Sequence, residues 1–424
     1  MKKELFDVMP LGNAPECTYT MDCEQTQLNN NVAGVGGSGS GKTMSLSAPL
    51  LLYTYYKSLV VTLSKRKLVK DFTEVFRRRG YNVLDLNLGE VKQSEIGFDP
   101  LRYCRTESDI ANLAHAIAYS GVDKEIFRGD TFWNDAAAQL LQALITFAKL
   151  KYKKPTFNTV IWLYDRLQPD EYCNTGLDNE FESIKRSHPT CYTDWTSFRR
   201  LHQNGLRSVW GSLGTALHSI FTPEVRSLIK KDSQIDLRKI GQEKTILFLT
   251  SSPANVAEHR FINIFYSQLF KELFEYAEQC EDGRLPVPVH VLCDDFACGS
   301  RIQDFPQMIS VFREKRISVT LLLQSESQLS SMYGKDDATT IINNCDSYVY
   351  LGSMDYSTAD VVSRRIDVPV SDILWMPIGQ EILFRRGQKP IQTERYDILH
   401  DRLYQEQVLK QEKEAGQRSN DHVA

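Results

Sequence analysis

Residues 36–43 have the sequence Gly-Gly-Ser-Gly-Ser-Gly-Lys-Thr, and no other feature constrains the fold of this chain as strongly. The stretch matches the phosphate-binding pattern Gly-x-x-x-x-Gly-Lys-[Ser/Thr] at every fixed position. Its glycines allow the backbone to turn tightly and to point successive N–H groups at one anion. The predicted nucleotide-binding residues are therefore Gly36, Gly37, Ser38, Gly39, Ser40, Gly41, Lys42 and Thr43.

Two side chains of this phosphate loop have distinct predicted roles. The Lys42 ammonium can reach β- and γ-phosphate oxygens, and the Thr43 hydroxyl can bind a metal, so the predicted ligands are ATP and Mg²⁺. In the empty loop we expect the Lys42 side chain to face water. A short apolar run at 31–35 predicts a strand before the loop, and 44–56 predicts a helix after it, whose N-terminus favours phosphate. This context argues against a Gly/Ser linker that merely contains a lysine.

The order of the predicted elements indicates an α/β fold with a mainly parallel sheet. Strands are predicted at 58–63 and 81–86, with a helix at 67–79 between them. Helices then dominate from about 106 to 200, at 108–120, 131–150, 156–167 with Thr156 as the N-cap, 181–186 and 194–203. Alternation returns with strands at 244–249, 289–293, 318–323, 347–352 and a final edge strand at 381–385, and helices at 257–280, 303–315 and 355–366.

These elements predict five segments. Residues 1–30 form an irregular lead-in, and 402–424 form a charged tail without an apolar face, expected to be frayed or disordered. A nucleotide-binding domain is built from 31–104 and 206–401. An all-α domain, residues 105–205, is inserted between its two parts.

Composition limits the possible partners and the compartment. The chain has 424 residues, a formal net charge of −4 and nine scattered cysteines without a Cys-x-x-Cys pair. A nucleic acid must therefore be bound by local basic patches, for which the sequence offers 65–67 with Lys70, 77–79, 151–154 and 230–231. Taken alone, each of these groups is more typical of a solvated surface. The cysteine pattern and the lack of an apolar run near the ~18 residues needed to span a bilayer predict a cytoplasmic protein.

Polar residues at the ends of two predicted strands complete the candidate site. Asp294 and Asp295 follow strand 289–293; the first is predicted to hold Mg²⁺ and the second to polarise an attacking water. Carboxylates in this position can also cap the next helix. Gln324 follows strand 318–323, where a γ-phosphate sensor would stand, although it could simply bond within its loop. Arg313 is a candidate for an arginine finger that reaches the γ-phosphate bound by a neighbouring subunit. The alternative is that Arg313 is an ordinary surface arginine.

Several short motifs, in this order, resemble the type IV secretion coupling proteins, the conjugative DNA-transfer ATPases related to FtsK/HerA-type translocases. They are residues 36–43, Phe98-Asp99-Pro100-Leu101, Phe132-Trp133, Leu292-Cys293-Asp294-Asp295-Phe296-Ala297, Leu323-Gln324-Ser325 with Ser327-Gln328-Leu329, Tyr333-Gly334 and Asn343-Asn344-Cys345. The resemblance implies a RecA-like P-loop NTPase with an inserted all-α domain. It also implies a homo-hexamer around single- or double-stranded DNA that delivers a relaxase–DNA complex to the proteins of a type IV secretion channel, driven by ATP hydrolysis.

The chain departs from the family pattern in three places. No transmembrane helices precede the motor, so contact with the inner face of the membrane is expected through a partner protein. The second carboxylate is usually Glu, and Asp295 is one methylene shorter. Leu63-Ser64-Lys65-Arg66 stands where the family usually has Asp-Pro-Lys-Gly. Two alternatives follow: an ATP-binding adaptor with weak or no hydrolysis, and a small-molecule kinase, against which the long helical insertion argues.

Overall fold

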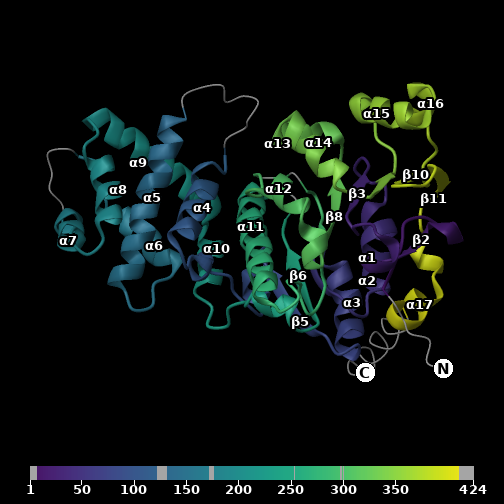
Figure 1. Ribbon diagram of the computed structural model, residues 1–424, viewed down its shortest axis with the longest axis horizontal. Coiled ribbons are helices and arrows are strands. Elements are labelled where there is room, and N and C mark those ends of the chain that lie inside the picture. Colours follow the sequence, from purple (N-terminus) through teal and green to yellow (C-terminus); the bar gives the residue numbers. More distant parts are fainter. Residues whose placement is uncertain are drawn as a thin grey trace, which may run out of the picture.

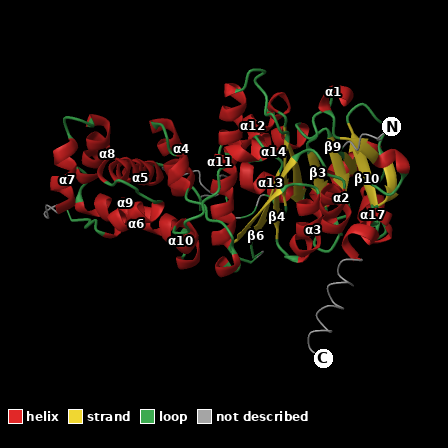
Figure 2. Ribbon diagram, turned by 90° about the horizontal axis from the view of Figure 1, so that it is seen from below, coloured by secondary structure: helices red, strands yellow, loops and turns green. Residues whose placement is uncertain are grey.

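One mixed sheet of nine strands runs through the residues that the computed structural model describes, which are 7–121, 131–170, 176–252, 254–296, 298 and 300–409. The strand order is β11-β10-β9-β3-β8-β7-β4-β6-β5, and Figure 2 labels β10, β9, β3, β4 and β6 of this sheet. The strands are β3 (Val32–Val35), β4 (Ser58–Leu63), β5 (Asn82–Asn87), β6 (Thr245–Thr250), β7 (Val289–Cys293), β8 (Ile317–Leu323), β9 (Ser347–Tyr350), β10 (Gln380–Arg385) and β11 (Ile391–Glu394). Neighbours from β9 to β5 pair in parallel, which confirms the predicted mainly parallel sheet.

The sheet separates two hydrophobic cores because successive side chains of a strand point to opposite faces. In β6, Ile246 and Phe248 lie in one core, and Leu247 and Leu249 lie in the other. Both faces are covered, so the central strands are apolar throughout rather than alternating with polar residues. Burial of both faces therefore explains the short apolar runs in the sequence.

Helices cover both faces of the sheet (Figure 2). The helices α2 (Ala48–Leu52) and α3 (Lys67–Arg78) pack on one face. The other face carries α11 (Val256–Gln279), α12 (Phe305–Ile309), α13 (Glu326–Tyr333), α14 (Lys335–Asn343) and α15 (Tyr356–Ile366), followed in the chain by α16 (Val370–Leu374). The predicted helix 44–56 is real but shorter, with a π-helical turn from Thr43 to Ser47 before α2.

A region composed of helices in its described part lies beside α11, at the left of Figure 1. It comprises α4 (Glu107–Ala118), α5 (Phe132–Lys151), α6 (Phe157–Asp165), α7 (Gly176–Ile184), α8 (Pro189–Arg199), α9 (Gln203–Ile220) and α10 (Pro223–Ile229). Thr156 caps α6 as predicted, through reciprocal bonds with Thr159. The expected boundary at residue 205 falls inside α9, so the helical stretch is longer than the sequence pattern indicated.

Two predicted elements of the second half are wrong in detail. The strand 381–385 is not at the edge, because β10 pairs with β9 on one side and with β11 on the other. The single helix 303–315 is replaced by α12 and a separate 3-10 turn from Phe312 to Lys315. Both Phe305 and Phe312 pack on Phe270, with ring centroids 5.6 and 4.8 Å away, and this tertiary packing competes with a continuous helix.

Both ends of the described chain are more ordered than the sequence suggested. The lead-in contains a two-stranded sheet of β1 (Val8–Pro10) and β2 (Thr18–Thr20), then α1 (Cys23–Thr26). The Asp7 carboxylate anchors it by accepting bonds from the backbone N–H groups of residues 55–57.

The tail also packs on the sheet domain over its described part, 402–409. It begins with α17 (Arg402–Tyr404). Tyr404 and Val408 are buried in the core that holds α3, and the Tyr404 hydroxyl donates to Asp71 at 3.2 Å. An apolar pair four residues apart was too short to be recognised as a face. The predictions of an irregular lead-in and of a frayed or disordered tail also cover residues 1–6 and 410–424, which lie outside the described residues.

Candidate functional site

The predicted site residues after β3, β8 and β7 lie at one edge of the sheet. These three strands are neighbours and run parallel, with Val35 beside Leu323 and Leu321 beside Cys293. Their carboxyl ends therefore place the phosphate loop, Gln324 and the Asp294–Asp295 pair side by side. Carboxyl ends of parallel strands are the usual location of ligand sites in α/β sheets.

The phosphate loop has a backbone conformation suited to an anion. Gly39 and Gly41 adopt φ of 77° and 95°, a region that glycine enters freely. The N–H groups of Gly36 and Gly37 bond to Leu323 and Gly352, which fixes the start of the loop to the neighbouring strands. The N–H groups of Ser38, Gly39, Gly41, Lys42 and Thr43 have no acceptor among the described residues. A row of unsatisfied donors at the start of a helix is an anion-binding nest.

Lys42 does not face water, contrary to the expectation from the sequence. Its side chain is buried, and its ammonium donates to the carbonyl oxygens of Gly36 and of Gly37, the latter at 3.1 Å. Burial lowers the pKa of Lys42, while the negative charges of Asp294 and Asp295 raise it. The loop carbonyls thus bind the ammonium, and phosphate oxygens would have to compete with them for it.

The two carboxylates stand in different backbone geometry. Asp294 follows directly on β7, and burial together with the charge of Asp295 raises its pKa to about 6, while Lys42 opposes that rise. Asp295 adopts a left-handed φ of 51°, and its N–H donates to the Asp294 carboxylate at 3.2 Å. The segment after them contains no helix until α12, so the helix-cap alternative has no adjacent helix to cap among the described residues. Ala297 of the same motif lies outside those residues.

Gln324 and Arg313 have contrasting positions. Gln324 is exposed at the end of β8, between the phosphate loop and the acidic pair, and bonds to no other described residue. Arg313 precedes β8 and therefore lies at the opposite edge of the sheet, where its guanidinium donates to Gln27 at 3.2 Å. The structure brings Gln324 to the other site residues of the same chain and does not bring Arg313 there.

Sequence reasoning missed one residue at this edge. The Arg395 guanidinium donates from Nη1 to the carbonyl oxygen of Ser40 at 2.8 Å. The chain reaches this position only because β10 and β11 form an antiparallel hairpin next to β9. No motif surrounds Arg395. Its position next to the phosphate loop could have been predicted only if strand β11, which the sequence analysis missed, had been recognised.

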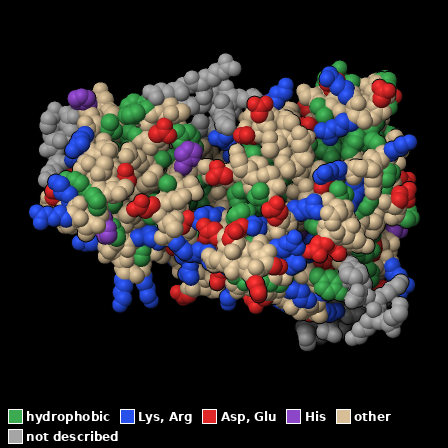
Figure 3. All heavy atoms as spheres, viewed as in Figure 1, with side chains coloured by type: hydrophobic (Ala, Val, Ile, Leu, Met, Phe, Trp, Pro, Cys, Tyr) green, Lys and Arg blue, Asp and Glu red, His purple; other side chains and the backbone are tan. Residues whose placement is uncertain are grey.

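Some side chains of the basic groups bind other residues of the fold and are not available to a partner. Arg66 pairs with Asp85, and Arg79 donates to the carbonyls of Leu51, Leu52 and Thr54. On the face seen in Figure 3, cationic and anionic side chains are intermixed over the middle of the molecule. The exposed cations that remain available for a polyanion include Lys151 at the end of α5, and Lys153 and Lys154 on the turn that follows it.

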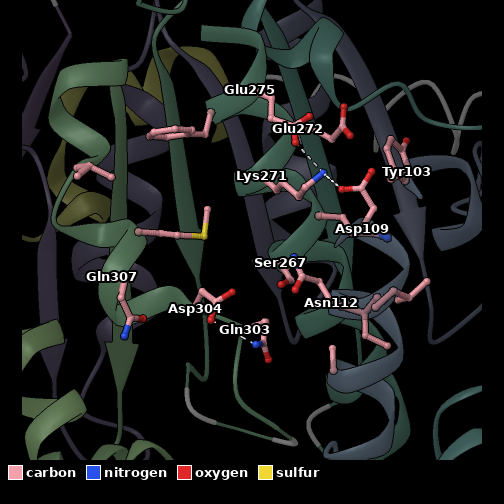
Figure 4. A pocket seen from close by; sticks show the side chains of 17 residues that line it. Tyr103, Asp109, Asn112, Ser267, Lys271, Glu272, Glu275, Gln303, Asp304 and Gln307 are labelled. Carbon is pink, nitrogen blue, oxygen red and sulfur yellow. Dashed lines mark hydrogen bonds and ion pairs between the residues drawn. The ribbon is translucent and has the colours of Figure 1, made fainter. Parts of the chain in front are cut away.

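A cavity of about 390 Å³ lies away from the phosphate loop, between α4, α11 and α12. In Figure 4, Lys271 is directed toward Asp109, with which it pairs, and it also binds Glu275 at 2.7 Å. Glu272, next to them, accepts from Arg105 at 2.6 Å and from Arg238 at 2.7 Å. The Lys271–Asp109 pair joins α4 of the helical region to α11, so we assign the cavity to this junction rather than to the nucleotide site.

The described part of the chain contains no helix that is long and apolar enough to cross a membrane. It also contains no cluster of three or more His, Cys, Asp or Glu side chains that could hold a metal by themselves. A Mg²⁺ ion does not need such a cluster, because phosphate oxygens and water supply most of its ligands.

The sequence and the fold were compared with known proteins. Curated protein sequences give no significant match. Among solved structures, the unbound bacterial conjugative coupling protein TrwBdeltaN70 is similar with a TM-score of 0.70 and 15% identity, covering 93% of this chain and 89% of that one. Plasmid coupling protein TrwB with ADP and Mg²⁺ has a TM-score of 0.68 and 16% identity, covering 87% and 85%. VirB4 of Thermoanaerobacter pseudethanolicus has a TM-score of 0.53 and 12% identity, covering 94% and 98%.

The structural similarity confirms a RecA-like P-loop fold with a helical region. The family described as "Type IV secretory system Conjugative DNA transfer" matches residues 11–367, which is most of the chain. The chain therefore belongs to the type IV secretion coupling protein family of conjugative DNA transfer.

Proposed function

We propose that this protein is an ATPase that drives DNA through a type IV secretion channel during conjugation. The observation that carries the proposal is the phosphate loop, whose free N–H groups lie at the same sheet edge as Asp294 and Asp295. Family membership supplies the biological context. A phosphate loop alone indicates only an NTPase.

The residues present fit ATP and Mg²⁺. The five unbonded N–H groups form a cradle for phosphate oxygens, and Lys42 would exchange its loop carbonyls for β- and γ-phosphate. The Thr43 hydroxyl and the Asp294 carboxylate are the ligands proposed for Mg²⁺, which would neutralise phosphate charge when bound. TrwB has been solved with ADP and Mg²⁺ and with an ATP analogue that is not hydrolysed, which supports the same ligands here.

We assign the hydrolytic roles by position. Asp295 would accept a hydrogen bond from the attacking water, and Gln324 would contact the γ-phosphate from the strand between the two halves of the site. Arg313 would act on the site of a neighbouring subunit. In one subunit it is separated from the phosphate-loop edge by the 7 residues of β8, roughly 20 Å at the usual rise per strand residue.

The proposed assembly is a homo-hexameric ring that encloses DNA. The inserted all-α domain would sit on a nucleotide-binding domain made of the segments before and after it. The partners would be DNA, a relaxase or relaxosome, and the channel proteins, with membrane contact made through one of them at the cytoplasmic face. A finger supplied by a neighbour requires a head-to-tail interface, and such an interface closes into a ring or grows into a filament.

A second candidate is an ATP-binding adaptor that recruits transfer substrates with weak or no hydrolysis. Two observations favour it: Asp295 is one methylene shorter than the family's usual Glu, and its backbone adopts a left-handed φ of 51°. Reach to the attacking water therefore depends on the local backbone rather than on side-chain length alone.

Steady-state ATP turnover with and without single-stranded DNA separates the two candidates. A motor should hydrolyse ATP faster when DNA is added, and Lys42→Ala should abolish the turnover. An adaptor should bind ATP with no more turnover than the Lys42→Ala protein, with or without DNA. Stimulation by DNA that persists in Lys42→Ala would contradict both readings, because the activity would then arise elsewhere.

A further inference from the structure

The hairpin of β10 and β11 brings a distant part of the chain back to the phosphate loop. β10 runs antiparallel to β9, so its first residues lie at the edge where β3 ends. β11 runs antiparallel to β10 and pairs Glu394 with Gln380, so the residue after it arrives at the same edge. Arg395 is that residue, and its own N–H bonds to the carbonyl oxygen of Gly379 at 2.9 Å, which fixes its backbone.

The Arg395 side chain makes two contacts with the loop. Nη1 donates to the Ser40 carbonyl at 2.8 Å, and the guanidinium lies against Gly41. A Cβ added to Gly41 would collide with the guanidinium, and the φ of 95° at Gly41 already disfavours any other residue. The loop and the arginine are therefore packed together closely enough for one to fix the other.

The direction of the Ser40 carbonyl determines the direction of the next N–H group. Ser40 and Gly41 are joined by a trans peptide, because the described chain contains no cis bond. In a trans peptide the C=O and the N–H point in opposite directions. A carbonyl held on the Arg395 side thus directs the Gly41 N–H to the other side, and that N–H has no acceptor among the described residues.

A buried carboxyl lies on the same hairpin. Glu381 of β10 is fully buried, and neither carboxyl oxygen has a hydrogen-bond partner among the described residues. Burial raises its pKa to about 8, and the Arg395 charge acts in the opposite direction. A carboxyl with this raised pKa is largely uncharged at neutral pH and does not neutralise Arg395. No ion pair of Arg395 occurs within the described chain. Its charge is available to the loop.

We propose that Arg395 is a positioning residue for the nucleotide phosphates, which holds the Ser40–Gly41 peptide so that the Gly41 N–H faces them. The guanidinium also adds a permanent positive charge behind the loop, because arginine stays protonated. This inference rests on the proposed nucleotide site and goes beyond it, since it assigns to the C-terminal hairpin a part in forming the phosphate cradle.

Titration calorimetry with Mg²⁺-ADP tests the inference on the full chain. Arg395→Gln should weaken binding about tenfold, the scale of one charge-assisted hydrogen bond. Arg395→Lys should recover part of that loss, because it restores the charge and one donor. In steady state, KM for ATP should rise more than kcat falls, a split that general damage to the fold would not produce.

The same hairpin offers a matched control. Arg386 lies between β10 and β11 at the opposite end, and its largely exposed side chain pairs with Asp346 at 3.4 Å. Arg386→Gln should leave nucleotide affinity unchanged. Parent affinity and parent KM in Arg395→Gln would overturn the inference, provided that Lys42→Ala has lost binding; binding that survives in Lys42→Ala would refute the nucleotide site itself. If Arg395→Gln does not fold, Arg395→Lys decides: a KM for ATP above that of the parent protein is expected there, and parent KM would overturn the inference.

Discussion

Lys42 donates a hydrogen bond from Nζ to the carbonyl oxygen of Gly37 at 3.1 Å, so the cation proposed to bind phosphate is satisfied by its own loop. This relationship predicts the behaviour of Lys42→Ala. The variant should lose ATP turnover because a direct phosphate contact is removed. Stability without nucleotide should fall by about 1 kcal/mol, the usual contribution of a hydrogen bond. Turnover and urea unfolding measure the two effects separately, and parent turnover in Lys42→Ala would contradict the loop assignment.

The acidic pair should respond asymmetrically to substitution. Asp295→Asn should keep ATP binding and lose turnover, whereas Asp294→Asn should weaken binding that depends on Mg²⁺. Asp295→Glu should raise turnover if side-chain reach is limiting, and lower it if the left-handed backbone at Asp295 already brings the carboxylate close. Nucleotide affinity at two Mg²⁺ concentrations and kcat decide. Mild and equal effects of the two Asn variants would show that neither carboxylate has its assigned role.

Binding of Mg²⁺-ATP should depend on pH through Asp294. Burial and the neighbouring Asp295 raise its pKa to about 6, so in the free protein the metal-binding carboxylate form is lost as pH falls through 6. Affinity should increase roughly tenfold between pH 5 and pH 7 and level off above, following the ionised fraction of a single group. ATP itself also titrates in this range, so the same series on Asp294→Asn provides the correction. Identical pH profiles for the two proteins would refute the prediction.

The ion pairs made by two glutamates of α11 should stabilise the fold unequally. Glu272 is 1% exposed and accepts from both Arg105 and Arg238. Glu272→Ala should destabilise the protein by about 3 kcal/mol, because it breaks a buried charge network and leaves a cavity. Glu275 binds Lys271 and Arg238 but is 39% exposed, and Glu275→Ala should cost at most about 1 kcal/mol. Urea unfolding of both variants compares them, and equal losses would show that burial of the network is not important.

The sequence identified the parts of the site that depend on local chemistry. The phosphate loop was recognisable because strand, glycine spacing and helix follow one another, and the acidic pair because it ends an apolar run. Parallel strands bring their carboxyl ends together, so the meeting of the loop with Asp294 and Gln324 could be predicted without the strand order. The order itself, with β8 between β3 and β7, could not be predicted.

The remaining features depend on contacts between distant segments. Arg395 reaches Ser40 only through pairing of the short strand β11, whose four residues Ile-Gln-Thr-Glu include a single strongly apolar side chain and are too few to be recognised as a strand. Lys42 turns inward because loop carbonyls are within reach, which residue types do not reveal. The break between α12 and Phe312 follows from packing on Phe270, which lies 42 residues before Phe312 in the chain. In each case tertiary contact overrides the local pattern.

Assembly gives the last prediction, because Arg313 and the phosphate loop lie at opposite edges of one subunit. A finger role for Arg313 is therefore possible only between subunits. We expect a monomer at low concentration without ligand, and a hexamer when ATP and DNA are added, since ligands that bind the ring favour it by mass action. Mass measurement in solution follows this change. DNA affinity should fall steeply as salt increases, because each phosphate contact releases counterions.

Mixed rings test the shared site directly. Lys42→Ala subunits have lost the phosphate contact and keep Arg313, whereas Arg313→Ala subunits keep the loop and have lost the finger. Each protein alone should be nearly inactive. When the two are mixed, a junction between an intact loop and an intact finger forms wherever the two kinds of subunit meet in the productive order, so part of the ATP turnover should return. Arg316→Ala, which alters a neighbouring cation beyond the same 3-10 turn, is the matched control and should be active by itself. If the parent protein stays monomeric with both ligands and still hydrolyses ATP at full rate, each chain has a complete site, and the ring is not needed for hydrolysis.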